Sequence, residues 1–192
     1  MNKLALIAVV LVAACGGGGG NNSPKGPLIY TDPPDGALRL IADKAATPTK
    51  MVLDLVVGST AQTGYATGFD LPLDVSKVSF AAFTPGTALS PGSAPIAAQG
   101  SIPTTGPLAN ELVVAQSQKA AGTGAVATDT MLGSGSVLLS IELDYTTGAP
   151  DGTVFDGQGS GFVLPSGGLV DRAGNAIVTS TDLQIGTLVV KN

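Results

Sequence analysis

Apolar and polar residues alternate along much of the chain with a period of two. The clearest case is residues 137–144, where the odd-numbered positions are Val, Leu, Ile and Leu and the even-numbered ones are Leu, Ser, Glu and Asp. Residues 38–42, 51–57 and 65–75 show the same alternation. Because successive side chains of a β-strand point to opposite faces, this pattern predicts strands that each bury one face.

Four more strands are predicted between turn-rich stretches, over residues 78–82, 112–116, 162–164 and 183–189. In the last of them the odd-numbered residues are expected to face inward. Residues 90–107 and 120–136 are expected to be loops, because the first carries four prolines and the second is rich in Gly, Thr and Ala. Pro72 is expected at a sheet edge or a bulge, since proline cannot donate to a central ladder.

No segment keeps the 3.6-residue apolar period of a helix. Residues 110–119 come nearest, but their central Val-Val pair favours a strand. Eight or nine strands without a helix predict an all-β fold in which two sheets pack as a sandwich.

The first fifteen residues have the layout of a secretory signal: Lys3 is followed by an unbroken apolar run over residues 4–14. The run is too short to cross a hydrocarbon core, which takes about 20 residues. Residues 12–15 read Val-Ala-Ala-Cys, which resembles the lipobox of bacterial lipoproteins. That resemblance implies that Cys15 is lipidated and is the first residue of the mature chain; the alternative is an ordinary cleaved signal with nothing attached.

Residues 16–36 are predicted to be a flexible tether, because they open with five glycines and continue with Asn, Ser, Pro and Gly. The folded domain is then expected over residues 37–192. Gly16 is not the aspartate that retains some lipoproteins in the inner membrane, so by the same resemblance the expected location is the cell envelope, at the outer membrane or cell surface.

Composition narrows the possible functions. Only 12% of the 192 residues are charged, and without Lys3 eight basic residues face 14 acidic ones, a net charge of about −6. The basic residues are scattered singly, so no nucleic-acid partner is expected. The chain has no histidine and one cysteine. Triads that need histidine, the standard zinc sites and an internal disulfide are therefore excluded, and no enzymatic activity is predicted.

Carboxylates are the remaining candidates for chemistry. Glu142 and Asp144 lie two apart on a predicted strand and share a face, as a glycosidase pair could, but a solvated outer face is the better explanation of them. Asp144, Asp151 and Asp156 lie in a turn-rich stretch that could supply oxygen ligands to calcium, although their spacing is not that of an EF-hand. Otherwise no cofactor is expected.

Sugar binding would need exposed aromatic rings. The chain has no tryptophan, and Tyr65 and Tyr145 are the best candidates for a carbohydrate platform. For each of them a core or rim role is favoured over sugar binding.

Several stretches share their order and sequence with one family. Residues 51–57 read Met-Val-Leu-Asp-Leu-Val-Val, residues 85–89 read Pro-Gly-Thr-Ala-Leu after a strand, and similar matches occur over 68–74, 135–143 and 169–177. Together they resemble a cohesin domain, the jelly-roll module of cellulosome scaffolds, over residues 38–190. The resemblance implies a jelly roll that binds a dockerin, a small calcium-binding module, through one sheet face. Relatives of that fold include carbohydrate-binding modules.

The sequence thus predicts a lipid-anchored, cohesin-like binding module for a dockerin-like or other protein. The alternatives are a carbohydrate-binding module linked to polysaccharide binding or breakdown, and a structural envelope lipoprotein. The partner surface is expected to be the outward acidic set formed by Asp70, Asp74, Glu142 and Asp144. The loop at 90–107 is longer and richer in proline than the family pattern, so no family contact residue is assigned here.

Overall fold

The computed structural model describes residues 26–89, 96–119 and 128–192, and within these ranges it contains strands but no helix. The predicted all-β class is confirmed. The strands are β1 (Leu28–Thr31), β2 (Leu38–Ala42), β3 (Lys50–Val57), β4 (Gln62–Gly64), β5 (Ala66–Pro72), β6 (Val78–Pro85), β7 (Ile96–Ser101), β8 (Glu111–Gln118), β9 (Thr130–Leu132), β10 (Val137–Tyr145), β11 (Gly152–Asp156), β12 (Ser166–Val170), β13 (Ala176–Val178), β14 (Leu183–Ile185) and β15 (Thr187–Val190).

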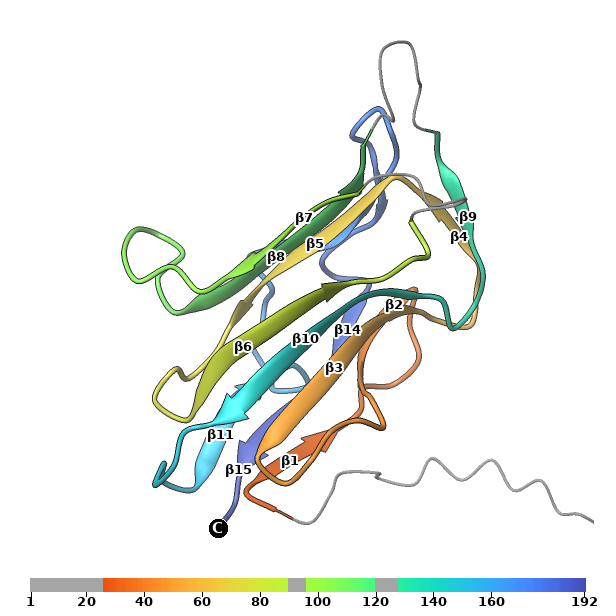
Figure 1. Ribbon diagram of the computed structural model, residues 1–192. Helices are drawn as coiled ribbons and strands as arrows, with labels where there is room; N and C mark the ends of the chain where they lie inside the picture. The colour runs from red at the N-terminus through yellow and green to blue at the C-terminus, as the bar shows by residue number, and fades with distance from the viewer. Residues whose placement is uncertain (1–25, 90–95, 120–127) are drawn as a thin grey trace, which may run out of the picture.

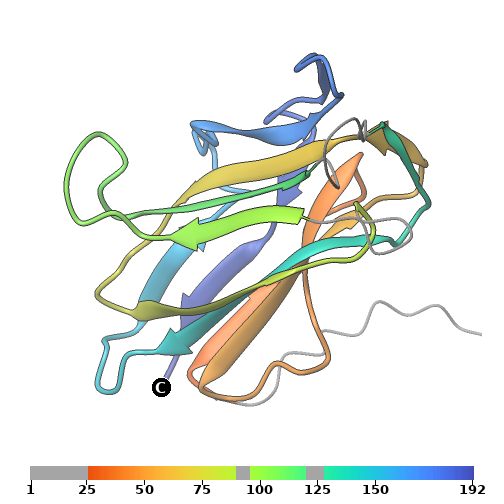
Figure 2. The same cartoon turned by 45° about the horizontal axis from the view of Figure 1, so that its top comes forward.

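Two five-stranded sheets form the body of the protein (Figure 1). The β3 sheet has the order β14-β2-β3-β10-β6, and the β5 sheet has the order β13-β12-β5-β8-β7. The two sheets lie in separate layers in Figure 2, as a β-sandwich requires. All strand pairs are antiparallel except β14 with β2. A three-stranded sheet, β1-β15-β11, and a two-stranded ribbon, β4-β9, complete the described part.

The core is built from the predicted alternation. Leu53 and Leu55 of β3, and Leu139 and Ile141 of β10, are at most 1% exposed. Phe69 supplies a buried ring from the facing β5. Fully burying a side chain of this size contributes about 1.5–3 kcal/mol, so the layered core accounts for the close apposition of the two sheets.

The predicted last strand over residues 183–189 is two strands in two different sheets. β14 belongs to the β3 sheet and β15 to the three-stranded sheet, and Gly186 lies between them. The buried positions switch from odd to even residue numbers there: Leu183 and Ile185 are buried before the glycine, and Leu188 is buried after it. A Cβ at Gly186 would lie 2.1 Å from the Thr31 carbonyl oxygen, so only glycine allows the chain to cross over here.

Two other positional predictions are wrong. Leu138 was expected to face solvent, but it is fully buried, because a register shift between Val137 and Leu139 turns it inward. Pro72 was expected at an edge or a bulge, but it ends β5, which lies between β12 and β8. Proline is tolerated there because it occupies the last position of the strand rather than its interior.

The predicted tether also contains a strand. β1 pairs with β15 in register, Leu28 opposite Val190, and its buried side chains join the core. Residues 28–31 therefore belong to the folded domain, which begins earlier than the predicted residue 37. The proposed signal, Cys15 and residues 16–25 of the tether lie outside the described residues.

Several strands escaped the sequence pattern. β7 lies within the predicted loop at 90–107, β9 within the loop at 120–136, and β11 in a region assigned to turns. Conversely, residues 162–164 are not a strand; the strand begins at Ser166. Consequently the described residues contain fifteen strands instead of eight or nine. β7 and β12 consist largely of Ala, Gly and Ser, which carry no hydrophobic alternation to detect.

Candidate functional site

The outer face of the β5 sheet is composed of small side chains. In its central row, Gly68 of β5 pairs with Gly168 of β12 on one side and Ala115 of β8 on the other. In the next row Ala66 lies between Val170 and Ser117. The alternation of β5 and β8 sends their largest apolar residues into the core, so the centre of the outer face carries short side chains.

These small residues leave the face hollowed. Two adjoining depressions of about 310 and 360 Å³ share Ala66, Thr67 and Ala115 in their linings. Gly68 cannot be replaced by a larger residue without a shift of the backbone, because a Cβ there would lie 2.5 Å from the Val114 carbonyl oxygen. The close packing of backbone against backbone thus keeps the floor of the hollow open and uncharged.

Two carboxylates lie at one end of this face. Asp70 accepts a hydrogen bond of 2.7 Å from the Ser166 hydroxyl. Glu111 begins β8 opposite Pro72, and its Oε2 atom is buried without a hydrogen-bond partner in the described structure. A buried carboxylate oxygen without a partner costs free energy, and its burial keeps it out of reach of another molecule. Asp70 is the carboxylate at this end that lines the hollow.

The outer face of the β3 sheet is different because it carries more charged residues, some of which have partners within the protein. Lys50 forms an ion pair of 2.6 Å with Glu142. Asp54 accepts a 2.6 Å hydrogen bond from the Ser140 hydroxyl. Burial raises the pKa of Asp54, and the adjacent Asp43 adds to that rise, whereas the Ser140 hydrogen bond opposes it. Arg39 of β2 is an exception, because its Nε atom is buried without a hydrogen-bond partner in the described structure.

The structure does not bring the four predicted partner-binding residues onto one face. Asp70 is on the β5 sheet, whereas Glu142 and Asp144 are on β10 of the β3 sheet. Asp74 lies in the turn between β5 and β6, where it pairs with Lys77 and accepts hydrogen bonds from Ser76. Lys77 and Ser76 together lower the pKa of Asp74 to about 2. Of the four, only Asp70 adjoins the hollow face.

The other predicted carboxylate sites are dispersed as well. Glu142 is engaged with Lys50 rather than free for acid or base chemistry with Asp144. Asp151 accepts hydrogen bonds from Asn192, and Asp156 accepts one of 2.6 Å from the Thr187 hydroxyl. Among the described residues, no group of three or more acidic, histidine or cysteine side chains is gathered as a metal ion would need, so the predicted calcium set is not assembled there.

Neither candidate tyrosine lies on the hollow face. Tyr65 precedes β5 and is half-buried, and its position in the alternation matches that of the inward-facing Thr67. Tyr145 ends β10 in the opposite sheet and packs partly against the core. Its hydroxyl lies 2.9 Å from the Asn192 side-chain oxygen. The described geometry does not combine the two rings into one sugar platform.

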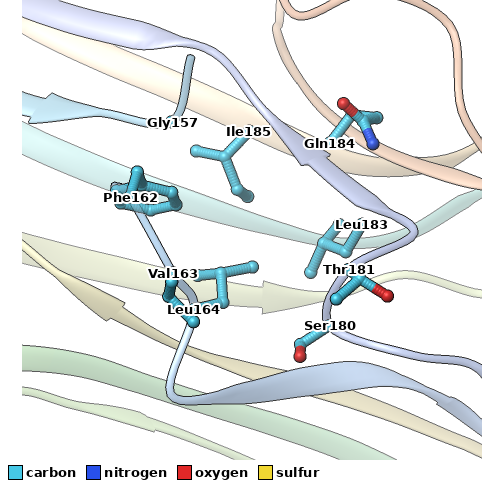
Figure 3. Close-up of a pocket in the computed structure, with 9 residues that line it drawn as sticks. All are labelled: Gly157, Phe162, Val163, Leu164, Ser180, Thr181, Leu183, Gln184 and Ile185. Carbon is cyan, nitrogen blue, oxygen red and sulfur yellow. The ribbon is translucent and has the colours of Figure 1, made fainter. Parts of the chain in front are cut away.

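A second pocket, of about 240 Å³, borders the open edge of β14. Figure 3 shows Phe162 and Val163 on one side of it and Leu183 and Ile185 on the other. The Ile185 end of this edge is already occupied, because the Gln158 side-chain amide donates to the Ile185 carbonyl oxygen at 2.5 Å. Sequence reasoning missed this pocket, since residues 162–164 were expected to pair as a strand.

No protein-family model matches the chain, and no curated protein matches it. In the parts of the chain that the structure describes, no helix is long and apolar enough to span a membrane.

Proposed function

We propose that this protein is a lipid-anchored binding module of the cell envelope, with a cohesin-like jelly roll that docks a protein partner on the outer face of the β5 sheet. One observation carries the proposal: this face is hollowed, built from small side chains and almost uncharged, in a chain whose net charge is −5. Glycines and other small residues in a strand mark places where another backbone or a ligand approaches closely.

The sheet arrangement supports the cohesin-like part of the proposal. The five-stranded sheets face each other, and the chain's last segments return to pair with its first strands, β14 with β2 and β15 with β1. The stretches that resemble cohesins supply strands of both layers, including β3 and β10 in one and β5 in the other. The resemblance and the layered fold therefore agree.

The chemistry of the face favours a protein over a polysaccharide. The outward rows of β5, β8 and β12 carry Ala, Gly, Val and Ser but no aromatic ring on which a sugar could stack. Small residues let another backbone or an aliphatic side chain approach closely. Asp70, which lines the hollow, then suits a lysine or arginine of the partner. The partner is a dockerin-like module that presents apolar side chains beside a basic residue.

A matched pair of surface variants tests this docking face. Ala115→Arg places a long cation in the hollow, whereas Ser79→Arg places the same side chain on an exposed position of β6 in the opposite sheet. The lipid-free chain and both variants are titrated with calcium-loaded dockerin modules by isothermal calorimetry. We expect Ala115→Arg to weaken binding at least tenfold and Ser79→Arg to leave it unchanged, with equal melting temperatures.

Equal affinities of the two variants would contradict docking on the outer face of the β5 sheet. If no dockerin binds the wild-type chain, the proposed class of partner is wrong. The same chains are applied to a glycan array. If the chain binds a glycan on the array, and substitution of Tyr65 or Tyr145 abolishes that binding, the carbohydrate-binding alternative replaces the proposal. Silence in both assays would favour a structural envelope protein.

A further inference from the structure

We draw no further inference here: the strongest candidate, the pocket of mixed polar and apolar lining between the open edge of β14 and residues 162–164, carries none because nothing in the structure shows what covers it.

Discussion

The hydroxyl of Tyr30 accepts a 2.9 Å hydrogen bond from the backbone N–H of Gly186, 156 residues away in sequence. The same hydroxyl donates to the Leu40 carbonyl oxygen at 2.7 Å. The tyrosine is buried, its ring packs edge-on against Phe155, and burial raises the pKa of its phenol well above the usual value. Tyr30 therefore joins β1, β2 and the crossover between β14 and β15 inside the core.

Tyr30→Phe is expected to destabilise the fold while keeping the ring. The substitution leaves the Gly186 N–H and the Leu40 carbonyl without this partner in a buried site, and each such group costs about 1–3 kcal/mol. We expect the free energy of unfolding in urea to fall by about 2 kcal/mol or more. Tyr145→Phe is the control, because its hydroxyl contacts lie near the surface, and it should cost less than about 1 kcal/mol. Equal losses of unfolding free energy in the two variants would contradict the role of the Tyr30 hydroxyl in joining these strands inside the core.

Gly168→Ala tests the packing beneath the hollow face. Gly168 has a φ of +131°, and a Cβ there would lie 1.9 Å from the Val178 carbonyl oxygen of β13. Backbone cannot yield as a flexible side chain does, so we expect a loss of more than about 2 kcal/mol in thermal or urea unfolding. Gly133→Ala is the matched control, since its nearest neighbour would be the Ser136 hydroxyl oxygen at 3.8 Å. A Gly168→Ala protein as stable as the control would contradict the pairing of β12 with β13.

The pKa shifts of Asp54 and Asp74 predict opposite effects of pH on the stability of the fold. The pKa of Asp54 in the folded protein is raised above its ordinary 3.8, so folding favours its protonated form and stability declines as pH rises through the raised pKa. The pKa of Asp74 is lowered to about 2, so its contribution is present above pH 3.8 and is lost as pH falls toward 2.

Asn substitutions separate the two effects in urea unfolding measured between pH 2.5 and 7. Asp54→Asn should stabilise the protein at pH 7, where the wild-type carboxylate is charged and half-buried, while keeping an oxygen for the Ser140 hydroxyl. Asp74→Asn should destabilise it at pH 7, and by progressively less as pH falls from 3.8 toward 2.5. The same sign for both variants at pH 7 would refute the assigned environments.

The chemical state of Cys15 in the mature chain, and the effect of substituting it, test the proposed lipid anchor. We expect mass spectrometry of the mature chain to find a diacylglycerol-modified cysteine as the first residue, and Cys15→Ser to move the protein from the membrane fraction to the soluble one. Two or more acyl chains hold stably because each buried CH₂ contributes about 0.8 kcal/mol. An unmodified Cys15, or cleavage at another position, would remove the anchor from the proposal.

The local pattern was enough to identify the strands that bury large side chains. β3, β5 and β10 could be placed from the alternation of Leu, Ile, Phe and Val with polar residues, because a strand exposes alternate residues to the core whatever its partner is. The class of fold followed from the same signal. β7 and β12 could not be found this way, since their small residues carry no alternation and pair through backbone hydrogen bonds, β7 with β8 and β12 with the distant β5.

The sequence by itself therefore determined that the protein is all-β and which side of its strongest strands is buried. Only the tertiary structure decided which sheet each strand joins. Asp70 and Glu142 both alternate outward, yet they point away from the core on opposite layers, so a shared binding face could not be judged from spacing. The crossover at Gly186 and the hollow over Gly68 depend on backbones that meet from far along the chain. Such contacts leave no periodic trace in the sequence.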